Sequence, residues 1–575
     1  MLRRIFSYMK EYKKYAWLAL ICIGVEVVLE IMVPKLMADL IDIGVTNSDV
    51  PYIINKGIQM AVCAVAALIL GVGSARFSAL AGQGLGANIR KAEYEKLQSY
   101  SFSNIDHFSV SSLVTRLTSD VTNIQNAVST GMRPFGRSPV MLIFATTLAF
   151  KINSTLALVF LVALPVLAVL LIIIIINVGP RYGRMQGAVD LVNRCIEENL
   201  TAVRVVKSYV RGDYEIEKFG HVNDNLKNES EKAFGIAVLN MPAMQFVMYS
   251  TILGILLIGG RLINSGQMMI GQLTSFLSYV LLILNSLMMM SNVFLLMTRS
   301  LASAERIMKV IDEPIDITDE NAKDIEVKKG EIEFNHVWFK YKDTAKEYVL
   351  SDVSFHINAG QTVGIIGQTG SSKTTLIQLI PRLYDASKGE IKIDGISIKE
   401  YPVRHLRDAI SVVLQKNTLF SGSLIDNLRW GDENATLDEI KEACSIACVD
   451  EFIDRLPGGF DAEMGQEGVN VSGGQKQRIC IARAILKKPK VLILDDSTSA
   501  VDTATEGKIR NALAKKLPDM TKIIIAQRIS SVRHADQIII MDGGCVNAIG
   551  THESLLKTNK IYQEIYESQK EGADL

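Results

Sequence analysis

The feature that most constrains the fold is a series of long apolar runs within the first 300 residues. The clearest is "TLALVFLVALPVLAVLLIIIIINV", residues 155–178, which contains no charged residue. A helix needs roughly 20 mostly apolar residues to cross a bilayer. We therefore expect six membrane helices. The third is short and contains Pro134 and Pro139, so its ends are the least defined. The six runs cover about 15–36, 57–82, 134–150, 155–178, 238–263 and 270–297.

Basic residues are concentrated on one side of these runs. They precede the first run and follow the second and the fourth, whereas the intervening loops carry almost none beyond Lys56 and Lys151. Cytoplasmic loops of membrane proteins are enriched in Lys and Arg. We expect both termini to be cytoplasmic, because the N-terminal "MLRRIFSYMKEYKKY" also lacks a small-residue cleavage site. The basic residues are Arg3, Arg4, Lys10, Lys13, Lys14, Arg90, Lys91, Lys96, Arg116, Arg181, Arg184, Arg194, Arg204, Lys207 and Arg211.

The two long cytoplasmic loops, roughly 83–133 and 179–237, are charged and helical in pattern. Helices of about 40 residues extend well beyond a bilayer, because each residue adds about 1.5 Å. Such loops can reach a cytosolic domain and pass motion to it.

Two features of the membrane part allow more than one interpretation. Glu26 and Glu30 share a helix face, so they line a substrate path, pair with a neighbour such as Arg76 or lie near the outer interface. Seven methionines favour either a flexible drug-binding surface or ordinary helix packing. They are Met241, Met244, Met248, Met288, Met289, Met290 and Met297.

From about residue 330, short β-rich runs alternate with helical patterns, as in an α/β domain. "TVGIIGQTGSSKTTLIQLI" reads as strand, glycine-rich loop and helix, which approximates the phosphate-binding pattern G-x-x-x-x-G-K-[ST]. Gly367, Lys373 and Thr374 fit this pattern, while Ser372 occupies the place of the second glycine. Further along, "KVLILDDSTSAVD" is an apolar strand that ends in two carboxylates, and Asp495 is placed to bind Mg²⁺.

Between these motifs lies "NVSGGQKQRICIARAIL", where Ser472, Gly473, Gly474 and Gln475 precede a helix and suit anion binding. With this motif the sequence resembles ATP-binding cassette (ABC) transporters over essentially its whole length, as a half-transporter of the exporter type. The resemblance implies an all-α transmembrane domain of six helices, the type I exporter or type IV transporter fold, over 1–310. A linker over 311–329 and an α/β P-loop nucleotide-binding domain over 330–575 would follow.

The resemblance also implies roles for single residues, with ATP and Mg²⁺ as ligands. Tyr341 matches the aromatic residue that stacks on adenine, and Gln415 matches the glutamine that reaches Mg²⁺ beside Thr374 and Asp495. "MGQEG" resembles the exporter cross-talk loop, although its usual Gly-Glu order appears here as Gly465-Gln466-Glu467. "SAVD", Ser499–Asp502, matches the loop that crosses the cassette dimer. Coupling helices are expected near 104–112 and 203–213. The implied phosphate-binding residues are Gly367, Gln368, Thr369, Gly370, Ser371, Ser372, Lys373, Thr374 and Thr375.

Three residues of the nucleotide site depart from the family pattern. The family has a catalytic glutamate after the Mg²⁺-binding aspartate and a histidine about thirty residues later, whereas this chain has Asp496 and Gln527. The shorter carboxylate retreats by roughly 1.5 Å, and a displacement of about 1 Å can cost on the order of 100-fold in rate. Glutamine cannot stabilise developing phosphoryl charge as a cation can. Ser372 adds a Cβ at a position where either the backbone approaches the phosphate closely or φ is positive.

These departures fall on one composite site, because the resemblance implies head-to-tail cassette dimers. We therefore expect a heterodimer in which this chain holds a degenerate site and its intact signature serves the partner's site. The alternatives are a homodimer with slow turnover and a regulatory nucleotide-binding subunit.

The resemblance favours export of drugs, lipids or other amphipathic compounds over a dedicated peptide or siderophore carrier. The expected partners are a second half-transporter, membrane lipid and an amphipathic small molecule. With a net formal charge of zero, no nucleic acid is expected. The location implied is a bacterial plasma membrane, with the nucleotide-binding domain in the cytoplasm.

Overall fold

The computed structural model describes residues 2–496 and 501–571. The chain divides into two compact units, one of Met1–Leu97 with Ser111–Asp312 and one of Gln98–Val110 with Glu313–Leu575. The second unit thus includes part of the first cytoplasmic loop in addition to the C-terminal half.

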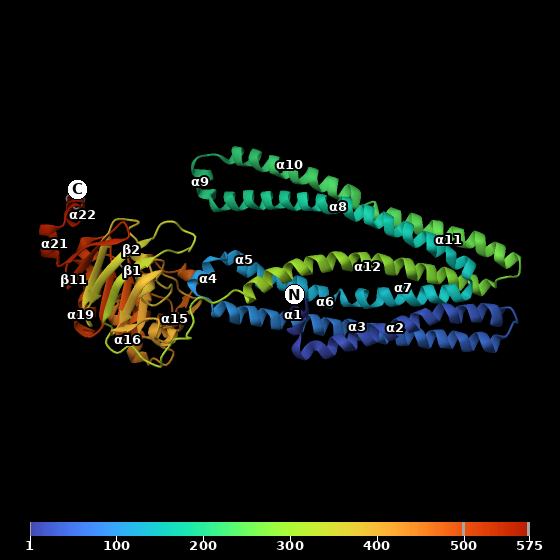
Figure 1. Cartoon of the computed structure of the whole chain (residues 1–575), viewed down its shortest axis with the longest axis horizontal. Coiled ribbons are helices and arrows are strands. Elements are labelled where there is room, and N and C mark those ends of the chain that lie inside the picture. Colours follow the sequence, from blue (N-terminus) through green and yellow to red (C-terminus); the bar gives the residue numbers. More distant parts are fainter. Residues whose placement is uncertain (1, 497–500, 572–575) are drawn as a thin grey trace. The chain divides into compact units, whose positions relative to one another are not determined.

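The first unit is built from long helices (Figure 1). Six stretches are long and apolar enough to cross a membrane, as the sequence predicts. The helices are α1 (Leu2–Ser7), η1 (Lys10–Tyr12), α2 (Lys13–Asp39), η2 (Leu40–Val45), α3 (Val50–Gln98), α5 (Val110–Thr115), η3 (Arg116–Asp120), α6 (Val121–Ser129), α7 (Met132–Ile152), α8 (Ser154–Thr201), α9 (Val203–Ser208), α10 (Gly212–Ala237), α11 (Asn240–Asn264) and α12 (Ile270–Ile311).

The third membrane helix is more regular than its sequence suggests. Pro134 lies in the first turn of α7, where the missing amide proton costs nothing, and Pro139 lies inside the helix without ending it. The helix packs against α2 and α12, and its buried Met141 and Ala145 belong to the apolar core of the membrane part. This packing keeps α7 continuous.

The two glutamates of the first membrane helix pair with arginines of α7, and not with Arg76 as proposed from the sequence. Arg133 Nη2 lies 2.6 Å from Glu26 Oε1, and Arg137 lies 3.3 Å from the same oxygen. Arg137 Nη2 also lies 2.6 Å from the Glu30 carboxylate. Two acids and two bases therefore neutralise one another between α2 and α7, as groups in a bilayer must.

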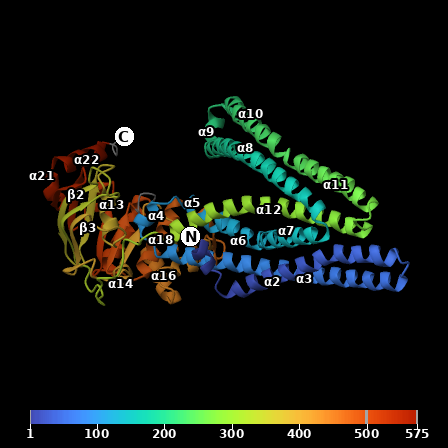
Figure 2. The ribbon, with the colours of Figure 1, turned by 45° about the vertical axis from the view of Figure 1, so that its right-hand side comes forward.

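Helices α8, α9, α10 and α11 form an arm within this unit. Helix α10 packs along α8, and α11 packs against the other end of α8. Figures 1 and 2 both show that α8 and α10 diverge from α7 and α12 toward α9. The short α9 therefore lies at the tip of a long helical hairpin, as the long second cytoplasmic loop predicts.

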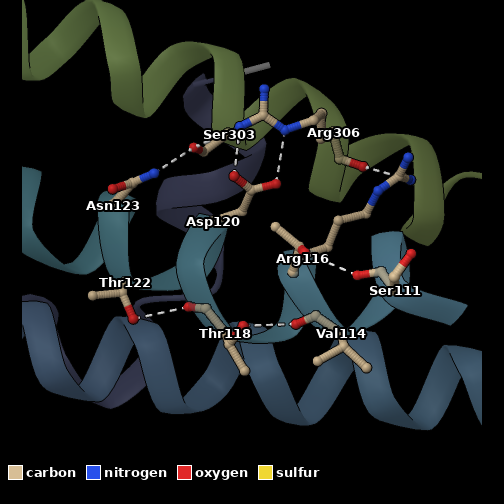
Figure 3. Close-up of polar contacts among 10 residues, drawn as sticks. Ser111, Val114, Arg116, Thr118, Asp120, Thr122, Asn123, Ser303 and Arg306 are labelled. Atoms are coloured by element: carbon tan, nitrogen blue, oxygen red, sulfur yellow. Dashed lines mark hydrogen bonds and ion pairs between the residues drawn. The ribbon is translucent and has the colours of Figure 1, made fainter. Parts of the chain in front are cut away.

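A polar cluster joins α6 and η3 to the end of α12 (Figure 3). Arg306 donates two hydrogen bonds to Asp120, of 2.8 and 2.5 Å, and one of 3.2 Å to Ser303 Oγ. Asn123 Nδ2 donates to the same Ser303 hydroxyl at 3.0 Å. Asp120 is buried at 2% exposure, so this pairing supplies a charge partner that an isolated buried carboxylate would lack.

The second unit contains two main sheets. The six-stranded sheet has the order β12-β11-β3-β10-β9-β6, and β11, β3, β10, β9 and β6 are mutually parallel. The antiparallel sheet has the order β2-β1-β4-β5, and β7 pairs with β8. The strands are β1 (Ile332–Phe339), β2 (Leu350–Ile357), β3 (Thr362–Gly367), β4 (Lys388–Ile393), β5 (Ile396–Ser397), β6 (Ile410–Val413), β7 (Gly422–Ser423), β8 (Glu463–Met464), β9 (Val491–Asp495), β10 (Thr521–Ile525), β11 (Gln537–Asp542) and β12 (Cys545–Gly550).

Helices cover the parallel sheet, whose central strands β9 and β10 are buried throughout. Continuous apolar runs such as "VLIL" are typical of parallel strands that are covered on both faces. The helices of this unit are α4 (Phe102–Asp106), α13 (Lys373–Leu379), α14 (Val403–Asp408), α15 (Leu424–Arg429), α16 (Leu437–Ile446), α17 (Asp450–Ile453), η4 (Gly459–Asp461), η5 (Gln466–Gly468), α18 (Gly473–Leu486), α19 (Thr503–Lys516), α20 (Ile529–Val532), α21 (His552–Thr558) and α22 (Lys560–Glu571).

Candidate active site

The predicted site residues gather at the carboxyl ends of four adjacent parallel strands. The glycine-rich loop follows β3 and Gln527 follows β10. Asp495 ends β9, Asp496 comes directly after it, and Gln415 follows β6. Ligands of open α/β sheets bind at this edge of the sheet. A cavity of about 320 Å³ lies there, lined by Thr369, Gly370, Ser372, Lys373, Thr374, Thr375, Gln415, Asp495, Asp496, Ile525 and Gln527.

The loop after β3 requires small or permissive residues. A Cβ on Gly367 would lie 2.2 Å from the Met541 carbonyl oxygen, so only glycine fits there. Gly370 and Ser372 both adopt positive φ, of 87° and 68°. The left-handed conformation costs a non-glycine residue roughly 1–2 kcal/mol, so Ser372 holds the loop shape at an energetic cost that glycine avoids.

Lys373 begins α13 and folds back over this loop. Its Nζ donates to the carbonyl oxygens of Gly367 and Gln368, each at 2.8 Å, and to Ser371 Oγ at 3.2 Å. Burial lowers the pKa of Lys373, while the nearby Asp495 and Asp496 act in the opposite direction. The ammonium group is thus held at the mouth of an anion-binding loop, beside two carboxylates.

Asp495 has the geometry of a metal ligand. It is 2% exposed, and Thr374 Oγ1 donates to its Oδ1 at 3.3 Å. Its other oxygen, Oδ2, is buried without a hydrogen-bond partner in the described part of the chain. Burial raises the pKa of Asp495, and the adjacent Asp496 raises it further. An orphaned carboxylate oxygen beside a threonine hydroxyl fits Mg²⁺, which takes one or two protein oxygens together with phosphate oxygens and water.

Asp496 and Gln527 contact each other directly. Gln527 Nε2 donates to Asp496 Oδ2 at 3.0 Å, and Asp496 has a positive φ of 45°. Burial raises the pKa of Asp496, while Lys373 and Arg528 lower it. Sequence reasoning missed Arg528, whose only signal is its position directly after Gln527.

Tyr341 lies beside the amino-terminal part of α13. Its hydroxyl lies 2.9 Å from Thr375 Oγ1 and donates to Gln378 Oε1 at 3.3 Å. The ring is 43% exposed and meets Tyr384 edge to face, with 5.2 Å between centroids. An exposed aromatic face near the phosphate loop can stack on a nucleobase.

The residues of the "SGGQ" motif do not line this cavity. Ser472 caps α18, where its hydroxyl accepts from the Gln475 amide at 3.3 Å and its own amide donates to Gln475 Oε1 at 2.9 Å. Ser472 and Gly473 are exposed. The helix N-terminus therefore presents a second anion-binding surface, separate from the phosphate loop.

The "SAVD" segment is only partly described. Ser499 and Ala500 lie outside the described residues, whereas the Asp502 side chain accepts from the Thr505 amide at 3.0 Å and caps α19. The predicted coupling helices correspond to two short elements, α4 in the second unit and α9 in the first.

Helix α4 packs on the nucleotide-binding unit through specific polar contacts. Tyr384 donates to Asp106 Oδ2 at 2.7 Å, and Asn104 Nδ2 donates to the Pro314 carbonyl at 2.8 Å. His107 Nδ1 lies 2.9 Å from Glu313 Oε1. Because Tyr384 also touches Tyr341, a short chain of side chains joins α4 to the aromatic ring beside α13.

Comparisons with known proteins agree with this geometry. Residues 16–287 match the ABC transporter transmembrane region and residues 350–499 match the ABC transporter family model. The chain is 37% identical to the ABC transporter ATP-binding protein YfiB of Bacillus subtilis, over 100% of both chains. It is 32% identical to an ATP-dependent lipid A-core flippase of Pseudomonas putida, over 98% of this chain and 95% of the flippase.

The fold is also that of a solved transporter structure. A bacterial Atm1-family ABC exporter with ATP bound superimposes with a TM-score of 0.84, at 22% identity, over 97% of this chain and 99% of the other. The chain therefore belongs to the ABC transporter family, as a multi-pass membrane exporter with one transmembrane domain and one ATP-binding domain.

Proposed function

We propose that this chain is one half of an asymmetric exporter, in which its own site binds ATP firmly and hydrolyses it poorly. The observation that carries the proposal is the contact between Asp496 and Gln527. These two residues stand where the family has its catalytic glutamate and its histidine, and they are hydrogen-bonded to each other at 3.0 Å.

The binding half of this proposal rests on the loop and the carboxylate Asp495. Loop amides and the Lys373 ammonium bind the phosphates, and Tyr341 stacks on the adenine. Thr374, Gln415 and Asp495 would hold Mg²⁺, which screens the phosphate charge when bound. The orphaned Oδ2 of Asp495 supports this assignment.

The proposal of poor hydrolysis rests on the length of the Asp496 side chain and on the missing positive charge at Gln527. The Asp496 side chain is one methylene shorter than glutamate, and one of its oxygens accepts the Gln527 amide. A base must lie within hydrogen-bond reach of the proton that it removes. The neutral Gln527 adds no positive charge to the transition state, so both changes slow hydrolysis without removing a phosphate-binding group.

A second chain is needed to complete the site. The signature residues Ser472 and Gly473 are exposed and lie outside the cavity that holds Lys373 and Asp495. In the proposed heterodimer, this signature completes a competent site on the partner. The partner in turn covers the degenerate site of this chain.

A groove on the nucleotide-binding unit supports the same assembly. It has a volume of about 390 Å³, and its lining includes Phe420 and Trp430, which are 44% and 65% exposed. The two rings stack at 4.1 Å. Exposed apolar residues also lie on helix α9 and directly after it, among them Val205 and the C-cap residue Tyr209. We propose that the α9 helix of each half docks in this groove of the other half and transmits nucleotide-driven motion.

The proposed cargo is a drug, a lipid or another amphipathic compound. The lipid A-core flippase among the relatives supports the lipid class. A dedicated substrate does not follow from the fold, because the cassette chemistry is shared across the family.

The decisive experiment is to measure ATPase turnover of the purified chain with and without the product of an adjacent cassette gene. We expect activity only with the partner, lost when the partner's catalytic glutamate is replaced and retained in Asp496→Asn. Robust turnover of this chain alone, lost in Asp496→Asn, would instead establish a working homodimer.

A second measurement separates a transport subunit from a regulatory one. Lys373→Ala should reduce partner-dependent transport, because ATP bound in this site holds the two cassettes together. Unchanged transport in Lys373→Ala would favour a scaffold that needs no nucleotide of its own.

A further inference from the structure

An apolar groove at the start of the first membrane helix is not part of the nucleotide site. Its volume is about 500 Å³, and its walls come from α1, α2, α6, α7 and α12. Its lining contains one charged side chain, Lys13, and one hydroxyl, Ser300, and the other lining residues are apolar or glycine. Three aromatic rings at the groove are well exposed, namely Phe6, Trp17 and Phe135 at 42%, 68% and 58%.

The groove lies at the level of the cytoplasmic lipid headgroups. Lys13 begins α2, which reaches Asp39 and continues through η2, so about 26–32 residues at 1.5 Å separate Lys13 from the outer end, roughly 40–48 Å. A bilayer is about 40–45 Å thick including its headgroups. Met297 on α12 lies 27 residues from the outer start at Ile270, which gives about 40 Å by the same measure.

The wall formed by the N-terminus is fixed in place. Arg4 donates to Asp312 at 2.8 and 2.5 Å, and Asn88 Nδ2 donates to the Tyr8 carbonyl at 2.9 Å. Ile5 and Met9 are buried beneath the groove, at 2% and 4% exposure. The groove is therefore a preformed feature of the helical unit, which favours binding of a ligand.

The single charged side chain of the groove, Lys13, favours an anionic ligand. The first 14 residues contain five basic residues and one acidic residue, Glu11. Arg4 is engaged by Asp312, whereas Lys13 is exposed and forms no ion pair with any residue that the structure describes. Basic residues next to a membrane surface attract anionic lipids by about 1 kcal/mol each.

We propose that this groove binds an anionic phospholipid of the cytoplasmic leaflet. One acyl chain lies among the apolar walls between α2, α7 and α12, and the phosphate pairs with Lys13. The aromatic rings lie at the interface, where amphipathic rings are favoured. None of the groove's lining residues lines the nucleotide cavity.

Trp17 provides a direct probe of the site, because the other two tryptophans, Trp338 and Trp430, lie in the nucleotide-binding unit. The full chain is placed in phosphatidylcholine nanodiscs that contain either brominated phosphatidylglycerol or brominated phosphatidylcholine at equal mole fraction. Bromine quenches nearby tryptophan fluorescence, and Trp17→Phe identifies the Trp17 signal.

We expect the anionic lipid to bind at Trp17 about fivefold more strongly, the factor that corresponds to 1 kcal/mol for one lysine. Lys13→Gln should abolish this preference and Lys13→Arg should retain it. Lys14→Gln is the matched control, because it removes the same charge next door and Lys14 does not line the groove.

A second pair of variants tests the apolar walls. Ala127→Leu narrows the groove and should reduce quenching by the anionic lipid, whereas Ala64→Leu, at an exposed position of α3, should leave it unchanged. Equal quenching by the two lipids in the native chain would overturn the proposal. An equal loss of the preference for the anionic lipid in Lys13→Gln and Lys14→Gln would also overturn it, because the lipid would then be attracted by the basic surface as a whole and not bound at a defined site.

Discussion

At the scale of single residues, Ser372 shows a conflict between sequence and backbone. Its φ of 68° suits glycine, yet the position is occupied by serine and lines the nucleotide cavity. The neighbouring Ser371 has no such conflict, because it is buried and its φ is not positive. Replacement by glycine should therefore have opposite effects on stability at these two adjacent serines.

Ser372→Gly should stabilise the nucleotide-binding domain. Relief of the left-handed conformation, roughly 1–2 kcal/mol, outweighs the extra chain entropy of glycine, about 0.5–1 kcal/mol. We expect the thermal midpoint of this domain to rise by roughly 1–3 °C, measured by scanning fluorimetry in EDTA without nucleotide. Ser371→Gly should lower it, and an equal rise in both variants would contradict the role of φ.

Asp496 and Gln527 form the second residue-scale case. Asp496→Glu with Gln527→His should extend the carboxylate toward the nucleotide and add a group that can carry positive charge. We expect ATPase turnover, measured with a partner whose own catalytic glutamate is replaced so that it reports this chain's site, to rise at least about tenfold, within the range of about 100-fold for a 1 Å displacement. Asp496→Asn should leave turnover at the level of the native chain. An unchanged rate in the double variant would mean that other residues cause the slow hydrolysis.

At the scale of elements, the pairing of Asp120 with Arg306 joins η3 to α12 near the end of the helical unit (Figure 3). Arg116 adds a hydrogen bond of 3.2 Å from its Nη1 to the Arg306 carbonyl. The segment is a π-helix, a geometry that is rare and often functional. The pairing therefore stabilises an irregular turn within the first cytoplasmic loop.

Asp120→Asn should loosen this junction. Removing one partner of a fully buried ion pair costs about 3–5 kcal/mol, but the Arg306 side chain is 47% exposed, so solvent reduces the loss to roughly 1–2 kcal/mol. The loss of stability is measured as faster hydrogen exchange in peptides from η3 and from the end of α12. Glu305→Gln is the control, because its pair with Lys309 is more than 60% exposed on both sides. Equal protection of these peptides from exchange in Asp120→Asn and Glu305→Gln would contradict a stabilising role of the ion pair between Asp120 and Arg306.

At the scale of the whole molecule, the arrangement of two halves decides which surfaces act together. If α9 of each chain docks in the groove of the other, a homodimer contains Tyr209 and Trp430 in the same interface. In a heterodimer the two residues of this chain belong to different interfaces. The same pair of variants therefore reports on the composition of the dimer.

Tyr209→Ala and Trp430→Ala should each weaken assembly with the partner, because both remove large exposed aromatic surface. We expect their free-energy effects to add within about 0.5 kcal/mol, as for independent sites, measured from the concentration dependence of partner-stimulated ATPase. Tyr94→Ala, at a similarly exposed tyrosine on α3, is the control. Strong non-additivity would favour the homodimer.

The sequence by itself determined the membrane helices and the presence of an ATP-binding domain. Apolar length identifies a membrane helix without any tertiary information, and the six predicted runs correspond to six helices. The motifs around Lys373, Asp495 and Ser472 are local in the chain. Their order, together with the apolar runs, therefore predicts an exporter with one ATP-binding domain.

Only the tertiary structure decided which distant groups meet. Glu26 pairs with Arg133 and Arg137 instead of Arg76, and Tyr384 bonds to Asp106 from the first cytoplasmic loop. The contact of Gln527 with Asp496 depends on the adjacency of β10 and β9. Pairings of this kind depend on how helices and strands pack, and periodicity along one segment carries no information about the neighbour that it meets.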